Sequence, residues 1–237
     1  MKTPSATEIR RELKKIGDPA IAEHSKGFFK TGPGEYGEGD QFIGVRVPVL
    51  RKLAKNNRDL PLRGTLSLLR SRVHEERLLA LILMTLKYQK GSDDKKQEIF
   101  ELYCANTQYI NNWDLVDCSA HKIVGPFLMD RNRKPLYQYA SSESLWERRI
   151  AIMSTLAFIK ESDFDETLAI ADILLDDKED LIHKAVGWML REVGRQDRKV
   201  EESFIRSRYR SMPRTMLRYA IEHFEEPIRK RYLAGRV

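Results

Sequence analysis

The sequence predicts an all-α protein, and three observations support that prediction. Apolar residues recur at spacings of three and four almost throughout the 237 residues, while the alternation typical of strands is nearly absent. Helix-start signals are readable: Ser144 and Glu147 have the spacing of a capping box, and Pro48 and Pro213 suit first helical turns. Finally, related segments recur along the chain at a nearly constant spacing.

The helices follow one another with short connections. Apolar periodicity and the start signals place them, in chain order, near residues 5–16, 18–30, 48–57, 61–70, 74–89, 94–104, 112–129, 133–140, 144–159, 163–176, 180–193, 197–207 and 213–225.

The repeat is visible in segments 75–81, 146–152 and 182–188. Each has a small residue at one position and a basic residue at another, and they start 71 and 36 residues apart. Because 71 is about twice 36, one further unit should lie between the first two, and residues 111–117 occupy that place. A period near 36 with two helices per unit predicts an α-solenoid, whose second helices line a concave face.

Low-complexity linkers are missing, so residues 1–237 are expected to form a single domain. The one irregular insert is Thr31–Asp40, which contains glycines in the order Gly-x-Gly-x-x-Gly. No predicted strand precedes it, no helix opens on its last glycine, and its acidic residues would repel phosphate. A surface loop is therefore favoured over a dinucleotide site.

The charge distribution favours a polyanionic partner. The net charge is +7, and the stretch from Arg191 to the C-terminus holds 13 basic and 7 acidic residues. Residues Glu161–Asp180 hold nine acidic residues and a single lysine. This asymmetry suggests one surface for a polyanion, and the alternative is a solvated face with random clustering.

Several classes of protein are disfavoured. Cys104 and Cys118 make no disulfide framework, and the five histidines show no paired-ligand pattern, so neither a metal nor a cofactor is expected. The longest apolar run, Leu78–Met84, has seven residues, too few to span a bilayer. The first 17 residues are polar and charged, without a stretch suited to secretion. A cytoplasmic monomer without a membrane partner is expected.

The most informative string is Trp113-Asp-Leu-Val-Asp117. On a helix, Trp113 and Asp117 are separated by one turn and share a face. An aromatic ring beside a carboxylate suits a site that holds a developing positive charge. The alternative is a core tryptophan near a helix-capping aspartate.

Three motifs, Trp113-Asp-Leu-Val-Asp117, Trp146-Glu-Arg-Arg149 and Ala185-Val-Gly-Trp188-Met-Leu-Arg191, together with the helix pairs, resemble the DNA alkylation repair family of the AlkD type. The resemblance runs roughly from Phe28 to Phe224. It implies a right-handed solenoid of HEAT-like repeats with a concave DNA-binding face, and an alkylpurine DNA glycosylase activity.

The resemblance also implies roles for individual residues. The catalytic group would comprise Asp117, Trp113, Trp188 and Arg149. Arg149 is selected over Arg148 because the family's arginine follows a tryptophan by three positions, and Arg149 also departs from the repeat pattern. The alternative for Arg149 is an ion pair with residues 161–180. Arg148 shares the basic position of the repeat with Lys184, which indicates a structural role for it. The residues considered for DNA contact are Arg46, Val47, Arg191, Arg148 and Lys184.

The function implied is excision of positively charged N3- or N7-alkylated purines from double-stranded DNA, as in base excision repair, by hydrolysis of the N-glycosidic bond without a deep base pocket. Such a base leaves as a neutral group, so one carboxylate suffices where ordinary glycoside hydrolysis uses two. The alternative is a non-catalytic HEAT-like repeat protein that binds nucleic acid or protein partners.

Overall fold

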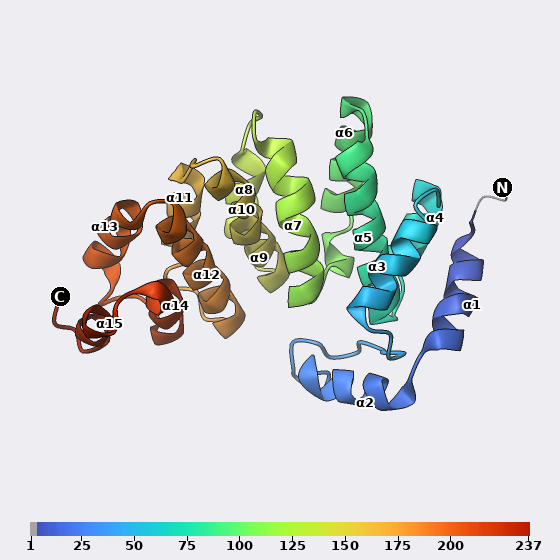
Figure 1. Ribbon diagram of the computed structural model, residues 1–237, viewed down its shortest axis with the longest axis horizontal. Helices are drawn as coiled ribbons and strands as arrows, with labels where there is room; N and C mark the ends of the chain where they lie inside the picture. Colours follow the sequence, from blue (N-terminus) through green and yellow to red (C-terminus); the bar gives the residue numbers. More distant parts are fainter. Residues whose placement is uncertain (1–3) are drawn as a thin grey trace. The chain divides into compact units, whose positions relative to one another are not determined.

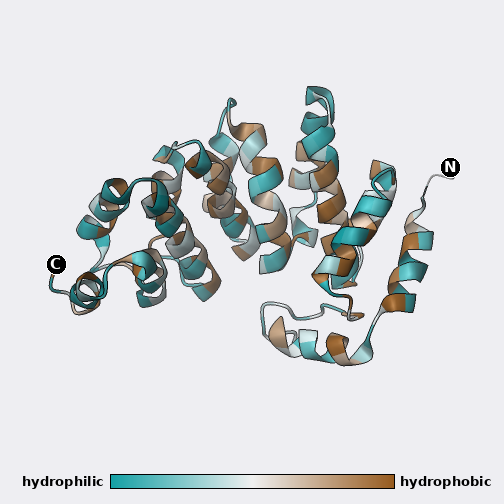
Figure 2. Ribbon diagram, in the orientation of Figure 1, coloured by the Kyte–Doolittle hydropathy of each residue, from teal (hydrophilic) through white to brown (hydrophobic). Residues whose placement is uncertain are grey.

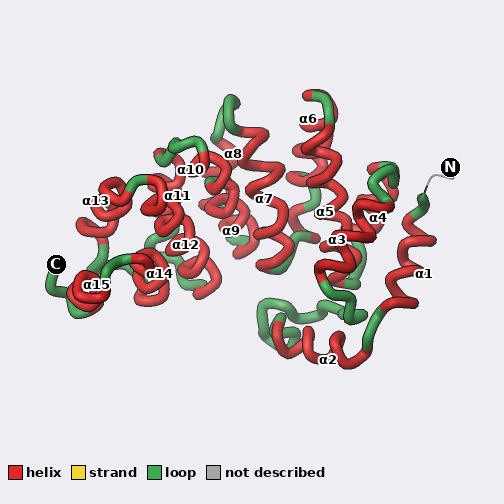
Figure 3. Tube along the Cα trace, viewed as in Figure 1, coloured by secondary structure: helices red, strands yellow, loops and turns green. Residues whose placement is uncertain are grey.

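The computed structural model describes residues 4–237, and their regular secondary structure is helical (Figures 1 and 3). Within this range the β-pairing is a single isolated bridge between Gln41 and Val73. The chain divides into two compact units, Met1–Ser119 and Ala120–Val237, and helix α7 runs across the boundary. None of the helices in residues 4–237 combines the length and apolar character needed to cross a bilayer.

The first unit is built around α5. α5 is buried along most of its length, from His74 to Met84, as expected for a helix that is covered on all sides. α3, α4 and α6 pack against it, and α1 packs against α4. The elements of this unit are α1 (Ala6–Ile16), α2 (Pro19–Phe28), α3 (Val47–Asn56), α4 (Leu62–Leu69), α5 (His74–Lys90), α6 (Asp93–Cys104), the 3-10 helix η1 (Thr107–Tyr109) and the start of α7 (Trp113–Leu128).

The second unit is built around α12, which contacts α9, α10, α11, α13 and α14. Gly187 permits the close approach of α14, because a Cβ there would lie 2.5 Å from the Met216 carbonyl oxygen. Its elements after α7 are α8 (Lys134–Ala140), α9 (Leu145–Ser154), α10 (Leu156–Lys160), α11 (Asp165–Ile173), α12 (Asp180–Gln196), α13 (Arg198–Arg208), α14 (Arg214–Ala220), the 3-10 helix η2 (Ile221–His223) and α15 (Glu226–Leu233).

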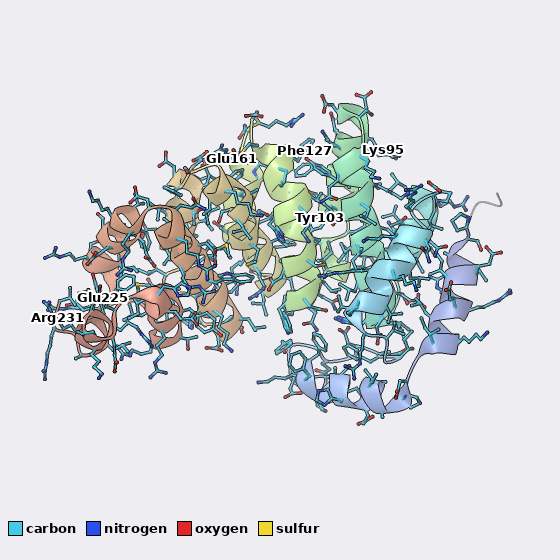
Figure 4. The ribbon with its side chains drawn as sticks, in the orientation of Figure 1. Lys95, Tyr103, Phe127, Glu161, Glu225 and Arg231 are labelled. Atoms are coloured by element: carbon cyan, nitrogen blue, oxygen red, sulfur yellow. The ribbon has the colours of Figure 1, made fainter. Side chains whose placement is uncertain are left out.

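Apolar packing defines the core of each unit. Most helices carry both hydrophobic and hydrophilic residues (Figure 2), and the apolar side chains are largely the buried ones. Tyr103, labelled in Figure 4, is fully buried in the first unit, and its hydroxyl is 3.0 Å from the Ser119 hydroxyl. Burial raises the pKa of Tyr103, so this phenol stays neutral and acts as a hydrogen-bonding group of the core.

The all-α prediction is confirmed, and each predicted segment contains an observed helix. Two differences have local causes. The segment 144–159 breaks at Thr155, whose hydroxyl donates to the Ile152 carbonyl at 2.8 Å and competes with helix continuation. α15 was not predicted, although Pro227 in its first turn and the basic residues of its last turn are helix signals. The curvature and the concave face stay predictions.

The predicted capping box at Ser144 is wrong. Ser144 is the N-cap of α9, but its side chain makes no capping bond. The Ser142 hydroxyl instead donates to Glu147 and accepts from the Ser144 N–H. Ser5 and Glu8 form a complete capping box at α1. Spacing alone does not distinguish these cases, because a loop serine two residues earlier can take the same carboxylate.

Candidate functional site

Trp113 is the first residue of α7 and Asp117 lies one helical turn later on the same face. The helix starts at Trp113 because the Asn112 side chain accepts the Trp113 N–H at 2.8 Å. Asn112 is fully buried, whereas Trp113 and Asp117 are half-buried. The predicted pairing of an indole with a carboxylate on one helix face is confirmed.

The Trp113 ring belongs to an aromatic cluster supplied by the end of α2. Phe29 stacks on it with ring centroids 5.4 Å apart, and Phe28 meets it edge-on at 5.9 Å. Among residues 4–237, Phe28 is the most exposed large apolar side chain, at 57%. Neither phenylalanine was predicted as a site residue from the sequence. The signal was available as two adjacent aromatic residues at a helix end before a glycine-rich insert.

His74 connects the glycine-rich loop to α7. Its Nδ1 lies 3.0 Å from Asp40 Oδ2 and its Nε2 lies 2.8 Å from Asp114 Oδ2, and the side chain is 2% exposed. Arg77 donates to the other Asp40 oxygen at 2.6 Å. Phe29 and Phe42 contact the imidazole, with centroids 4.8 and 4.7 Å from it. Asp114 therefore ties the site helix α7 to α5 through His74.

The electrostatics of this network favour a charged imidazole. Burial alone would lower the pKa of His74, but the Asp114 and Asp40 carboxylates outweigh it and raise the pKa to about 9. Burial works to raise the pKa of Asp40, but the hydrogen bond from His74 and the charge of Arg77 hold it below its usual value. At neutral pH His74 is an imidazolium that donates to two carboxylates.

The loop before α3 is held by Glu75. Its carboxylate accepts the backbone N–H groups of Ile43, Gly44 and Val45 at 2.7–3.2 Å. Gly44 has a φ of +81°, and a Cβ there would lie 1.9 Å from the Asp18 carbonyl oxygen, so glycine is required. Insert 31–40 is thus more than a surface loop, because it delivers Asp40 to a buried ion pair beside this anchored turn.

Arg46 and Val47, two residues considered for DNA contact, follow directly after the segment that Glu75 anchors. Arg46 is the N-cap of α3 without a side-chain capping bond, and it is exposed. Val47 is 39% exposed. Both side chains are accessible to a partner.

Two adjacent arginines on α9 have different surroundings. Arg148 donates to Asp177 at 2.6 Å and to the carbonyls of Ser142 and Glu143. Arg77 makes the same kind of contact, to an aspartate and to the carbonyl six residues earlier. This shared geometry gives Arg148 a structural role in its repeat, in which it pairs with Asp177 of the acidic stretch.

Arg149 is 5% exposed and donates to the Leu181 carbonyl at 2.5 Å. Lys184, on α12, pairs with Asp180 at 2.7 Å and is 41% exposed. Lys184 is therefore accessible from the surface, whereas Arg149 is buried.

Trp188 and Arg191 lie one turn apart on α12. The Trp188 indole N–H donates to Glu192 at 2.9 Å, and the side chain is half-buried between fully buried neighbours. Arg191 forms an ion pair with Glu222 and lies 3.8 Å from Glu192. Trp188 is thus a partly accessible ring with a satisfied N–H, which suits a surface that presents a π-face.

The structure brings together Trp113 and Asp117, within the first unit. Arg149, Trp188 and Arg191 belong to the second unit, and their convergence with the first pair stays a prediction. Among residues 4–237, no group of three or more His, Cys, Asp or Glu side chains has the geometry of a metal site.

The comparisons with known proteins point in one direction. A family model described as DNA alkylation repair enzyme matches residues 9–224. A predicted DNA alkylation repair enzyme from Enterococcus faecalis is 17% identical, with a TM-score of 0.70, over 89% of this chain and 97% of its own. AlkD2 from Streptococcus mutans is 16% identical, with a TM-score of 0.54, over 94% of this chain and 100% of its own. No curated protein matches the sequence.

Proposed function

Because the chain belongs to the DNA alkylation repair enzyme family, we propose that it is a DNA glycosylase acting on N3- or N7-alkylated purines in double-stranded DNA. The observation that carries the proposal is the half-buried pair Trp113 and Asp117, one turn apart at the start of α7, with Phe29 stacked on the indole. The fold resembles solved structures of this family.

The chemistry follows from the charge of the substrate. Alkylation at N3 or N7 places a positive charge on the purine, which then departs as a neutral base. A strong general acid is unnecessary, unlike in ordinary glycoside hydrolysis. Asp117 stabilises the oxocarbenium character of the deoxyribose and orients the attacking water. The products are a free alkylpurine and an abasic site.

The aromatic residues hold the cationic nucleotide. Trp113 and Trp188 present π-faces worth roughly 0.5–2 kcal/mol each towards a cation. Phe28 and Phe29 keep the Trp113 ring in place, and the exposed Phe28 ring extends the aromatic surface. The lesion is held on a concave face of a HEAT-like solenoid without a deep base pocket.

The basic residues fix the DNA backbone. Arg46, Lys184 and Arg191 donate to phosphates, and Val47 packs against the strand opposite the lesion. Arg149 holds a phosphate beside the lesion, which requires its buried guanidinium to become accessible when DNA binds. Arg148 supports this surface through its brace to Asp177.

The defining experiment is release of free 7-methylguanine or 3-methyladenine from methylated duplex DNA by the purified protein. Release at a rate well above spontaneous depurination supports the proposal. A folded protein that binds DNA but releases no methylated base would be a non-catalytic HEAT-like repeat protein.

Binding to undamaged duplex DNA should weaken steeply with salt. The net charge of +7 is concentrated at the C-terminus, and each neutralised phosphate contributes about −0.9 to the slope of log K against log salt. Fluorescence anisotropy with a labelled duplex between 50 and 200 mM salt, roughly the range over which such contacts are lost, measures the slope. A slope near zero would argue for a protein partner instead.

Substitutions of the two adjacent arginines of α9 should have different effects, on function for Arg149 and on stability for Arg148. Arg149→Ala is expected to lower both DNA affinity and excision rate, because a phosphate contact beside the lesion is lost. Arg148→Ala is expected to lower the free energy of unfolding by about 1–3 kcal/mol through its lost charged hydrogen bonds. Each variant is the control for the other, measured by thermal melts and single-turnover excision. Equal excision by Arg149→Ala and wild type would remove Arg149 from the site.

A further inference from the structure

A cavity of about 350 Å³ lies in the second unit among α12, the start of α13 and η2. It is lined by Arg191, Gly194, Arg195, Arg198, Glu201 and His223. All six come from one stretch of the chain, so the cavity belongs wholly to this unit.

Three polar atoms of this cavity are buried without a hydrogen-bond partner. They are Oε1 of Glu201 and the Nε atoms of Arg191 and Arg198. Glu201 is 2% exposed, and its nearest ion-pair contact, Oε2 to Arg198 Nε, is long at 3.9 Å. Buried polar groups almost always have partners. Two donors and one acceptor left open in one cavity indicate a polar ligand.

The cavity is shaped around the carboxyl group of Glu201. A Cβ at Gly194 would lie 1.8 Å from Glu201 Oε2, so any larger residue there would require the Glu201 carboxyl group to move. The Arg198 guanidinium lies 3.3 Å from the centroid of the Phe224 ring, which supports it at the cavity wall. The open Arg198 donor is therefore held in place.

The charges that face Glu201 come from three elements. On α12, Arg191 pairs with Glu222 of η2, and Arg195 pairs with Glu192 and contacts His223 at 2.7 Å. On α13, Arg198 and Glu202 are the charged neighbours. The three guanidinium groups make the cavity suitable for an oxyanion.

We propose that this cavity binds a phosphate group, which accepts the open Nε–H bonds of Arg191 and Arg198 and a hydrogen bond donated by the neutral carboxyl of Glu201. The proposal goes beyond the glycosylase function, since it requires neither a damaged base nor hydrolysis. In a molecule whose Glu201 is ionised before binding, the Glu201 carboxylate takes up one proton from solution when a phosphate binds.

The protonation state of Glu201 supports this assignment. Burial raises the pKa of Glu201 to about 8, with Glu202 adding to the increase and with Arg198 and Arg191 acting against it. Below pH 8 the carboxyl is mainly neutral and donates a hydrogen bond. Above pH 8 it becomes a carboxylate that repels an anion.

The test is calorimetric titration of the full chain with inorganic phosphate at pH 8.0 and 9.5, where the charge of the ligand is nearly constant. The dissociation constant should rise on the order of tenfold between these pH values, because binding competes with ionisation of one group. Glu201→Gln should bind phosphate with the same affinity at both pH values. Glu161→Gln, which changes an exposed carboxylate of the same unit (labelled in Figure 4), should keep the wild-type dependence.

A second variant and a second ligand complete the design. Gly194→Ala displaces the carboxyl group and should lower phosphate affinity at least tenfold in a protein that still melts cooperatively. An undamaged duplex titrated at the same two pH values identifies the source of the phosphate. If duplex binding depends on pH and Glu201→Gln abolishes that dependence, the bound phosphate belongs to the DNA backbone. If only the binding of inorganic phosphate depends on pH, the phosphate belongs to a free ligand. No phosphate binding, or a pH dependence that persists in Glu201→Gln, would overturn the proposal whatever the excision activity.

Discussion

Replacing Asp117 with asparagine should lower the rate of release of 7-methylguanine or 3-methyladenine by about 10²-fold or more, the usual scale for losing one electrostatic stabiliser of a transition state. The substitution keeps the shape of the side chain and removes the charge opposite the cationic sugar. Single-turnover measurements on methylated duplex DNA give the rate of the chemical step. Affinity for undamaged DNA should persist, because no phosphate contact is lost.

The control is Asp130→Asn, which removes an exposed carboxylate just beyond the end of α7. It should leave excision unchanged, and both variants should melt like the wild type. Wild-type excision by Asp117→Asn would show that the carboxylate mechanism is wrong, even if the protein is a glycosylase.

Replacing His74 with glutamine should have the largest effect on stability. The pKa of His74 is about 9 in the folded protein, against about 6.5 for an ordinary histidine. Its charged form therefore stabilises the fold fully below pH 6.5, and this contribution is lost as the pH rises through 9. The difference corresponds to about 3 kcal/mol. His74→Gln should lose that amount at pH 6 and much less at pH 10.

Denaturant unfolding of both proteins at the two pH values measures this effect. His24→Gln is the matched control, because His24 is an exposed histidine of the same unit. An equal loss of stability at pH 6 and pH 10 would mean that His74 acts by packing between Phe29 and Phe42 and not by its charge. Excision should weaken in His74→Gln at pH 6, since Asp114 on the site helix loses its partner.

Local patterns were sufficient to predict the helices. Periodicity and start signals act over a few residues, so α5, α7 and α12 could be placed from the sequence. Residues four apart on a helix necessarily share a face, which is why Trp113 and Asp117 could be paired in advance. The repeat alignment likewise separated Arg148 from Arg149. In the structure Arg148 donates to Asp177 and Arg149 donates to the Leu181 carbonyl, so the two side chains have different surroundings.

Contacts between distant residues could not be predicted in this way. His74 meets partners 34 and 40 positions away, and nothing in the local pattern marks Asp40 as a buried counterion. The sequence by itself determined the helical class, the repeat spacing and the Trp113–Asp117 face, because those depend on local geometry. Only the tertiary structure decided the aromatic support from Phe28 and Phe29, the charge of His74 and the burial of Glu201, because burial and pKa depend on which helices pack together.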